Sequence, residues 1–480
     1  MRSAHRVETV RTAERTLMAR LPDGALMQRA AAGLAAACAD VLPRRVYGSR
    51  IVLLTGSGDN GGDTLYAGAR LATRGAGVTA VLLTPDRTHP DALKTLLRAG
   101  GTTTTPHSAA APISRADLVL DGIVGIGGKG GLRPEAAHLA DLVAASRATV
   151  VAVDLPSGIE PDTGEVHGAA VRADLTVTFG THKPGLLIDP ARAYAGSVRL
   201  IDIGLADTLP AAPALESLQH ADLAALLPHP SQESDKYRRG VVGIAAGSAR
   251  YPGAAVLAVA GALRGGAGAV RYVGAATDAV LARFPETLVS NTGPKKAGRV
   301  QAWVAGPGAG DDPAPVAEAL STDVPVLLDA DGLRLADRDT VRTRPAPTLM
   351  TPHAGEAAAL LGISREEVEA SRLTAVRELA RAYDATVLLK GSTTLIAAPD
   401  PDAPVRVNPT GTPWLATAGS GDVLSGLAGS LLAAGLSPLD AASAAAYLHG
   451  LAGRYAADGA PTGAHDVAEA IPAAWRDITA

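Results

Sequence analysis

Short apolar runs rich in β-branched residues alternate with helical segments along most of the chain, and this alternation constrains the fold more than any other feature. Residues 8–42 have helix-like spacing of apolar side chains, and helical stretches such as 63–74 and 134–146 follow. Alternating strands and helices predict a parallel, doubly wound sheet. The predicted strands of the first half are 50–56, 78–83, 116–122, 149–156, 174–180 and 196–204.

The alternation stops once and then begins again. Residues 206–240 contain four prolines and no clear strand, which is typical of a linker. A chain of 480 residues also exceeds one ordinary core, since domains hold roughly 100–200 residues. We therefore expect two α/β domains, residues 1–215 and 225–480. The predicted strands of the second half are 241–247, 268–274, 299–308, 324–332, 347–353 and 385–391.

Charge and cysteine content exclude several classes of protein. The net charge is −4, from 44 basic and 48 acidic residues, which gives no reason to expect nucleic acid or an anionic membrane as a partner. The single cysteine, Cys38, excludes an intrachain disulfide and favours a reducing compartment. No apolar stretch reaches the 18 or so residues of a membrane span, and the first twenty residues are charged throughout. We expect a soluble cytoplasmic protein with small-molecule partners, and a homo-oligomer is compatible with its alanine-rich surfaces.

A glycine-rich turn follows the first predicted strand. Residues 55–78 read "TGSGDNGGDTLYAGARLATRGAGV", which predicts a strand, a turn at 56–63 and a helix. Glycines let the backbone approach a ligand, and the amide groups at a helix N-terminus bind phosphate. The turn differs from the dinucleotide fingerprint because it carries two carboxylates, which would repel a phosphate. A cation is therefore expected nearby, and a purely structural turn is the alternative.

Polar side chains stand at the ends of the following strands. Asp121 and Asp154 each end a predicted strand, and Lys183 follows the next one. Ligands of open α/β sheets bind at these carboxyl ends, so the side chains are expected to line one pocket. Asn60, Asp121 and Ser157 supply oxygen donors that suit a hard cation, and Asp154 with Lys183 suits an acid–base couple. The alternative is that each acid caps its own turn.

Five blocks of this half, "GSGDNGGDTLYAGA", "DGIVGIGGKGG", "VDLPSGIEPDTGEVHG", "THKPGLL" and "VRLIDIGL", resemble the NAD(P)HX epimerase family over about 50–205. The resemblance implies a Rossmann-like domain with potassium bound by Asn60, Asp121 and Ser157. Asp59 stands where the family commonly has Asn, and Thr64 where it has Gly. The implied substrate contacts are Asp59, Asn60, Gly61, Gly62, Asp63, Gly125, Ile126, Gly127, Gly128, Lys129, Gly130, Gly131 and Asp154.

The second half carries a set of motifs suited to phosphoryl transfer. "AGSGDVLSG" predicts a glycine turn at Gly419 and Gly421 that leads into a helix, with Asp422 in the first turn. Such a turn offers amide donors to a phosphate, and an acid there can take the proton of a substrate hydroxyl. Alternatively, Asp422 is a helix-terminal acid worth about 0.3–1 kcal/mol. His353 could be an ordinary strand-end residue and Lys390 a surface lysine, although the chain has only seven lysines.

"GAAVLAVAGALRGGAGAV", "GPGAG", "DADGL", "TPHAGE", "LLKGSTT" and "ATAGSGDVLSGLAGSLLAAG" resemble the ADP- or ATP-dependent NAD(P)HX dehydratase family, within the ribokinase-like superfamily, over about 235–475. The resemblance implies a ribokinase-like α/β/α sandwich with magnesium and ADP as phosphoryl donor. Ala309 replaces the commoner Leu, and Ser420 the usual Thr. Implied contacts to the hydrated dinucleotide are Ala254 or Ala255, Gly308, His353 and Asp422, and those to the adenine nucleotide are Lys390, Gly391, Ser392, Thr393, Thr394 and Gly421.

Together the two resemblances imply a bifunctional enzyme of nicotinamide nucleotide repair. An epimerase would interconvert the R and S forms of hydrated NADH or NADPH, and a dehydratase would convert the S form at the expense of ADP. Asp422, Asp154 and Lys183 are the expected catalytic residues. The alternatives are a small-molecule kinase of ribokinase type with an appended dinucleotide-binding domain, and a first domain that binds without catalysis. The residues leave open ADP against ATP, the epimerisation mechanism, the oligomeric state and the placement of the domains.

Overall fold

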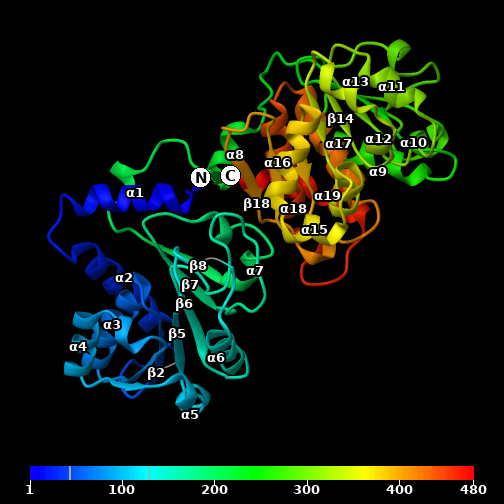
Figure 1. Ribbon diagram of the computed structural model, residues 1–480. Coiled ribbons are helices and arrows are strands. Elements are labelled where there is room, and N and C mark those ends of the chain that lie inside the picture. Colours follow the sequence, from blue (N-terminus) through cyan, green and yellow to red (C-terminus); the bar gives the residue numbers. More distant parts are fainter. Residues whose placement is uncertain (43–44, 129) are drawn as a thin grey trace. The chain divides into compact units, whose positions relative to one another are not determined.

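The computed structural model describes residues 1–42, 45–128 and 130–480, and the chain divides into two compact units (Figure 1). The amino-terminal unit is Ser3–Ala214, and the carboxy-terminal unit is Leu215–Ala480 together with Met1–Arg2. Among the described residues, no helix has the length and apolar character needed to cross a membrane.

The amino-terminal unit is built on a seven-stranded sheet in the order β4-β3-β2-β5-β6-β7-β8, and every neighbouring pair is parallel. The chain moves outward from β2 to β4 and resumes at β5 on the other side of β2. This reversal creates a switch point between β2 and β5, where ligands of such sheets bind. The strands are β2 (Arg50–Thr55), β3 (Gly77–Leu82), β4 (Thr102–Thr104), β5 (Leu118–Gly122), β6 (Thr149–Val153), β7 (Leu175–Phe179) and β8 (Ser197–Ile201).

Helices cover both faces of this sheet, as the continuous apolar strands require. Alternate residues of β2 enter different cores: Ile51 and Leu53 pack in one with α2 and α3, and Val52 and Leu54 in another with α5 and α6. The predicted doubly wound sheet is confirmed. The helices are α1 (Val7–Met18), α2 (Ala25–Val41), α3 (Asp59–Thr73), α4 (Pro90–Arg98), α5 (Ala110–Ser114), α6 (Pro134–Ala144) and α7 (Arg192–Ala195).

The predicted helical region 8–42 contains two helices. The chain leaves α1 after Met18 and enters α2 at Ala25, with Gly24 between them in the left-handed conformation at φ 74°. The apolar spacing of the two segments is correct, but the Pro22 and Gly24 that separate them break the hydrogen-bond ladder.

The carboxy-terminal unit contains most of an eleven-stranded sheet, in the order β1-β9-β18-β17-β16-β15-β14-β13-β10-β11-β12. The strands from β10 to β16 run parallel, and β17 is antiparallel to both of its neighbours. The strands are β1 (Arg2–Ala4), β9 (Leu215–Ser217), β10 (Val241–Ala245), β11 (Ala269–Val273), β12 (Leu288–Ser290), β13 (Ala302–Ala305), β14 (Val326–Leu328), β15 (Thr348–Met350), β16 (Thr386–Leu389), β17 (Thr394–Ala397) and β18 (Val405–Asn408).

Helices α9, α17, α18 and α19 enclose the main core on one face of this sheet, and α11 and α16 pack on its strands without entering that core. The predicted three-layer α/β/α sandwich is confirmed. The helices are α8 (His220–Leu226), α9 (Pro252–Arg264), α10 (Thr277–Arg283), α11 (Ala314–Leu320), α12 (Asp331–Leu335), α13 (Arg338–Thr343), α14 (Ala354–Leu361), α15 (Arg365–Ala370), α16 (Arg372–Tyr383), α17 (Ser420–Ala433), α18 (Pro438–Ala457) and α19 (Ala464–Thr479).

Glycines bring α9 and α17 into backbone contact. A side chain at Gly261 would collide with the carbonyl oxygen of Val423, and one at Gly426 with that of Ala258. The contact fixes how far α17 can slide against α9.

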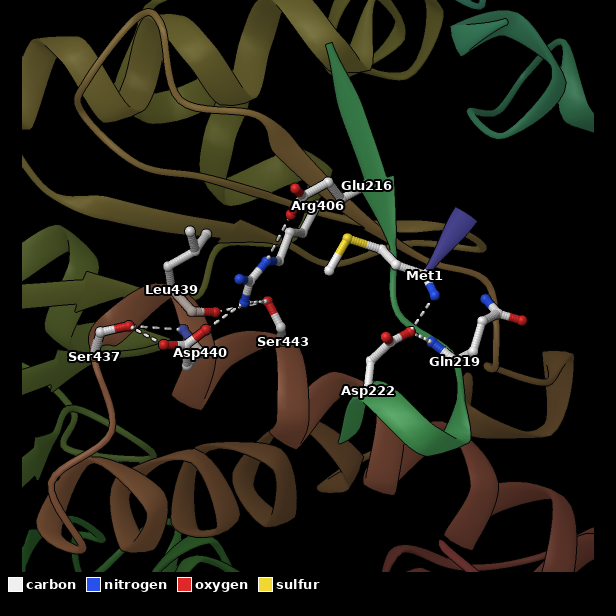
Figure 2. Close-up of polar contacts among 9 residues, drawn as sticks. All are labelled: Met1, Glu216, Gln219, Asp222, Arg406, Ser437, Leu439, Asp440 and Ser443. Carbon is white, nitrogen blue, oxygen red and sulfur yellow. Dashed lines mark hydrogen bonds and ion pairs between the residues drawn. The ribbon is translucent and has the colours of Figure 1, made fainter. Parts of the chain in front are cut away.

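The expectation of a strandless linker at 206–240 is wrong. Residues 215–217 form β9, which pairs in parallel with β18, and α8 follows. Figure 2 shows how this segment is held: the guanidinium of Arg406 on β18 pairs with Glu216 on β9 at 3.4 Å and with Asp440 on α18 at 2.6 Å. Asp222 on α8 accepts a hydrogen bond from the amide of Gln219 and pairs with the Met1 amino group at 2.7 Å. A three-residue strand between prolines carries too little periodicity to be read from sequence.

Candidate active sites

The glycine-rich turn of the amino-terminal unit lies at the switch point between β2 and β5. Residues 59–63 form the first turn of α3 directly after β2, and two of the glycines there leave no room for a side chain. A Cβ on Gly61 would overlap the carbonyl oxygen of Gly56, and a Cβ on Gly62 would lie 2.9 Å from Cε of Met27. Asp63 is buried, and its Oδ1 has no hydrogen-bond partner within the described ranges. Burial, reinforced by the charges of neighbouring carboxylates, raises the pKa of Asp63 well above its usual range.

Asp154 and Lys183 form a buried ion pair at the ends of β6 and β7. The Lys183 ammonium lies 2.5 Å from Asp154 Oδ1 and is 1% exposed, and it also donates to Thr178 Oγ1 and to the Phe179 carbonyl oxygen. Asp154 has a φ of 66°, a conformation that a non-glycine residue adopts only where the surroundings enforce it. The predicted acid–base couple is therefore brought together, with its carboxylate in a strained backbone position.

Two of the three predicted cation ligands are bonded to each other. The buried Asp121 carboxylate accepts hydrogen bonds from the amide and the hydroxyl of Ser157, both at 2.7 Å. Burial raises the pKa of Asp121 to about 6, although the hydrogen bonds from Ser157 act in the opposite direction. Asn60 reaches the same end of the sheet, since a Cβ on Gly125 would lie 3.1 Å from its Cγ. The Asn60 Nδ2 atom is buried without a partner within the described ranges.

This donor set fits a hard monovalent cation better than a transition metal. The available atoms are carboxylate, amide, hydroxyl and backbone oxygens, and an ion would offset the burial of Asp121. No group of three His, Cys, Asp or Glu side chains with metal-binding spacing occurs in the described part of the chain.

The loop after β5 forms the next wall of the site. The Gly128 amide donates to the Gly125 carbonyl oxygen at 3.0 Å, which closes a tight turn. Gly131 has a φ of 81° and its α-carbon packs against the His167 carbonyl oxygen. Six of the seven predicted contacts at 125–131 therefore follow the switch-point strand β5; Lys129 lies outside the described residues.

Helix α1 adds two charged residues that sequence reasoning missed. Its entry is tied to the turn that carries Lys183, because the His5 amide donates to the His182 carbonyl oxygen at 3.0 Å. Burial raises the pKa of Glu14, the Asp154 and Asp59 carboxylates raise it further, and Lys183 and Arg11 oppose this. A Cβ on Gly127 would lie 3.3 Å from the Arg11 guanidinium. Nothing local marks these residues, since they stand on an ordinary amphipathic helix.

In the carboxy-terminal unit, two of the predicted dinucleotide contacts, Ala254 and Gly308, meet at the switch point between β10 and β13. The Gly247 amide after β10 donates to the Pro307 carbonyl oxygen after β13 at 2.7 Å. A Cβ on Gly308 would lie 2.7 Å from Cβ of Ala254, whereas Ala255 is fully buried and points at Gly247. Of the two alanines that the sequence left open, Ala254 is therefore the one beside Gly308.

The predicted nucleotide-binding residues 390–394 form the tight turn between the antiparallel strands β16 and β17. A buried arginine holds this turn from beneath: Arg372 donates to the carbonyl oxygens of Leu389, Lys390 and Thr393 at 3.3, 3.1 and 3.0 Å. A side chain at Gly391 would collide with the guanidinium, so this position requires glycine. Arg372 could not be identified from the sequence, because it lies on α16, 18 residues before Lys390 in the turn it supports.

Asp422 stands in the first turn of α17, behind the left-handed Gly419 at φ 87°. None of the described residues donates a hydrogen bond to its carboxylate, so Asp422 forms no side-chain cap, whereas a favourable charge at the helix N-terminus needs no such bond. Burial, with a further contribution from the Asp329 carboxylate and against the effect of Lys390, raises the pKa of Asp422 to about 7. A Cβ on Gly421 would lie 3.5 Å from the Lys390 ammonium, which places the predicted base and cation side by side.

His353 and Lys390 meet through Glu356. His353 is the N-cap of α14: its Nδ1 accepts from the Glu356 amide at 3.1 Å, and Glu356 Oε2 accepts from the His353 amide at 2.7 Å. Glu356 Oε2 is 3.7 Å from the Lys390 ammonium. The imidazole of His353 is 59% exposed. It therefore caps a helix and still presents a ring to solvent at the rim of the site.

Comparison with known proteins matches each half of the chain to a protein family and the chain as a whole to two-domain relatives. Residues 242–473 match the family described as NAD(P)H-hydrate dehydratase, and residues 23–185 match the family described as YjeF-related protein N-terminus. A bifunctional NAD(P)H-hydrate repair enzyme of Mycobacterium leprae is 51% identical over 457 residues, which cover 94% of this chain and 93% of that protein. The chain belongs to the bifunctional NAD(P)H-hydrate repair enzymes.

Other members of the repair-enzyme family match along the whole chain. The Corynebacterium glutamicum protein of the same name is 37% identical over 581 residues, covering 100% of this chain and 99% of that one. Among solved structures, the ADP/ATP-dependent NAD(P)H-hydrate dehydratase of Bacillus subtilis, co-crystallised with ATP and Mg²⁺, is 29% identical with a TM-score of 0.51. It aligns with 55% of this chain and 99% of its own length, so the neighbour corresponds to one of the two halves. The family expected from the sequence motifs is confirmed.

Proposed function

We propose that this chain repairs hydrated NADH and NADPH. The amino-terminal domain, residues 1–215, epimerises the R and S forms, and the carboxy-terminal domain, residues 225–480, dehydrates the S form with ADP as phosphoryl donor. The proposal rests chiefly on the surroundings of Asp422. Its carboxylate accepts no hydrogen bond from the described residues, has its pKa raised to about 7, and lies at the N-terminus of a helix that follows a glycine turn, beside the Lys390 ammonium. Family membership supports both activities.

In the dehydratase domain, Asp422 takes the proton from the hydroxyl on carbon six of the S hydrate. The freed oxygen attacks the terminal phosphorus of ADP, and AMP leaves. The ring nitrogen lone pair then expels phosphate from carbon six, and loss of a proton from carbon five restores the carbon–carbon double bond. The products are NAD(P)H, AMP, phosphate and a proton, and the oxygen of the hydrate ends in phosphate.

The surroundings of Asp422 suit this transfer. Phosphoryl transfer depends mainly on positioning and on stabilising charge. The α17 N-terminus supplies amide donors, the Lys390–Thr394 turn holds the nucleotide, and Ala254, Gly308 and His353 contact the hydrated dinucleotide. Magnesium would be held chiefly by the nucleotide's own phosphates, as the described residues contain no metal cluster. When bound, it neutralises charge on the transferred group.

In the epimerase domain, Asp154 and Lys183 serve as base and acid in the reversible loss of configuration at carbon six. Either the ring nitrogen–carbon bond breaks while the hydroxyl gives up its proton and becomes an aldehyde, the nitrogen taking a proton, or the carbon–oxygen bond breaks and hydroxide leaves and returns. Residues 59–63 and the loop 125–131 bind the dinucleotide around this couple. A potassium ion held by Asn60, Asp121 and Ser157 would supply positive charge beside the carboxylates Asp59 and Asp63. The positive charge would offset the electrostatic repulsion expected between these two carboxylates and a phosphate of the substrate.

A mixture of R- and S-hydrated NADH tests both activities together. Purified protein is incubated with the mixture and with either ADP or ATP, and the dihydronicotinamide absorbance and nucleotide products are measured. We expect both epimers to be consumed, with AMP and phosphate formed from ADP. Consumption of the S form alone would refute the epimerase assignment. A stable phosphorylated product without recovered NADH would instead identify a small-molecule kinase.

The rate of dehydration should depend on pH through Asp422. A general base acts only when deprotonated, and the pKa of Asp422 is raised to about 7. We therefore expect kcat/KM for the S hydrate to fall about tenfold per pH unit below 7 and to level off above it. The measurement is a pH profile with saturating nucleotide. A profile flat down to pH 5 would show that no group with this pKa acts as the base.

A further inference from the structure

A buried carboxylate lies beneath the dehydratase site, and it belongs to a residue outside the predicted set. Asp329 directly follows β14 and is 1% exposed. Its Oδ1 accepts from the Lys390 ammonium at 2.7 Å, and its Oδ2 accepts from the Ser425 hydroxyl at 2.7 Å. Lys390 follows β16, and Ser425 lies on α17, three residues after Asp422. One carboxylate thus joins the nucleotide-binding turn to the helix that carries the base.

The backbone around Asp329 holds this carboxylate in place. The Asp329 amide donates to the Ala305 carbonyl oxygen at 3.2 Å, and its own carbonyl oxygen accepts from Gly332 at 2.9 Å. The next residue, Ala330, has a φ of 49°, an unfavourable conformation for alanine that only a constrained turn maintains. A side chain at Gly306 would collide with the Asp329 carbonyl oxygen. The turn after β14 therefore has little freedom to move, and it holds the Asp329 carboxylate in a fixed position for Lys390 and Ser425.

The charges around Asp422 come from several elements. Burial would lower the pKa of Lys390, but Asp329, Glu356 and Asp422 outweigh it and leave that pKa raised, so the lysine stays protonated. Asp329 acts on Asp422 as a like charge and helps to raise its pKa, whereas Lys390 lowers it. On α18, burial lowers the pKa of His449 to about 4, which leaves that ring neutral near pH 7.

We propose that Asp329 is a positioning residue of the dehydratase: it holds the Lys390 ammonium at the α17 N-terminus and, through Ser425, fixes the turn that presents Asp422. This role rests on the proposed phosphoryl transfer from ADP. Without the carboxylate, Lys390 has only Glu356 as a described ion-pair partner, at 3.7 Å, and moves away from the phosphate path. Asp422 and the Lys390 ammonium are then no longer both directed at the transferred phosphate.

Asp329→Asn tests this role with three readouts. Asn keeps an oxygen that can accept from Lys390 but removes the charge. We expect kcat for dehydration to fall about tenfold or more, and ADP, titrated calorimetrically without the hydrated cofactor, to bind about tenfold more weakly. We also expect the acid limb of the dehydration pH profile to move to lower pH, because a like charge beside Asp422 is gone. A merely structural role would lower the folded fraction and leave the pH midpoint unchanged.

Two further variants serve as a control for the loss of charge and as a second test in case Asp329→Asn does not fold. Asp458→Asn is the matched control, because it removes one carboxylate from an exposed left-handed position at φ 42°, which Asn tolerates, and should leave all three readouts unchanged. Ser425→Ala removes only the second partner of Asp329 and should lower kcat several-fold with little change in ADP affinity. Should Asp329→Asn not fold, unaltered kcat in Ser425→Ala overturns the proposal.

Failure of this proposal differs from failure of the proposed function. If wild-type protein does not dehydrate the S hydrate, the function itself fails, and the ADP titration still reports whether Asp329 positions Lys390. If the wild type is active and Asp329→Asn matches it in kcat, pH midpoint and ADP affinity, only the role of Asp329 is refuted.

Discussion

Asp422→Asn should lower kcat for dehydration by about 10²–10⁴-fold while epimerisation continues at the wild-type rate. The carboxylate accepts no hydrogen bond from the described residues, so its removal breaks no contact that the fold needs. Asn has the same shape and cannot take a proton from the substrate hydroxyl. The measurement is the recovery of NADH absorbance from the purified S hydrate with ADP, beside R/S interconversion by the same preparation.

The alternative for Asp422, a favourable charge at a helix N-terminus, predicts a different result. A terminal charge is worth about 0.3–1 kcal/mol, so the Asn variant would melt slightly earlier and turn over normally. Near-wild-type dehydration by Asp422→Asn would therefore contradict its role as base. Calorimetric ADP binding in the variant shows whether the nucleotide site is intact.

Asp154→Asn should lower the rate of epimerisation by about 10²–10⁴-fold with dehydration of the S form unchanged. Asn is the appropriate replacement for two reasons. It tolerates the φ of 66° at this position, and its side-chain oxygen still accepts from the Lys183 ammonium. Chromatographic measurement of the R/S ratio over time, starting from one pure epimer, gives the rate.

The Asp154 experiment needs a control for loss of charge. Asp141→Asn, on the exposed side of α6, removes one carboxylate from the same unit and should epimerise normally. Asp154→Ala is a poorer test, because it adds a left-handed alanine and leaves Lys183 buried without its counter-charge, a loss of about 3–5 kcal/mol. Full epimerase activity in Asp154→Asn would show that the pair is structural.

Most of the fold was predictable, and so was the grouping of the proposed catalytic residues, because both lie where local patterns are strongest. Strand runs ending in glycine and an acid mark the carboxyl edge of a parallel sheet, and the switch-point rule places those ends together. Asp154 and Lys183 were proposed in this way, Asp422 from its glycine turn before a helix, and Gly308 from the resemblance to the dehydratase family. The short strand β9 was missed, since three residues between prolines carry no periodic signal.

The contacts of the supporting residues were not predictable from sequence, although Asp329 is the first residue of the "DADGL" block. Asp329 lies 61 residues before Lys390 and 96 before Ser425, and Arg372 lies on a helix that precedes its turn. Glu14 and Arg11 stand on a helix with an ordinary amphipathic pattern. Nothing in the spacing of these residues indicates the strand ends they face, because the proximity arises only from the topology of the sheet.

The backbone contact between α9 and α17 has a consequence for how this enzyme can vary. Gly261 and Gly426 each admit a carbonyl oxygen of the facing helix, and this close approach constrains the position of α17 and of Asp422 in its first turn. A single methyl group at either position would lift the base away from the phosphate. The position of the proposed base is therefore constrained by two buried glycines that lie outside the predicted substrate contacts.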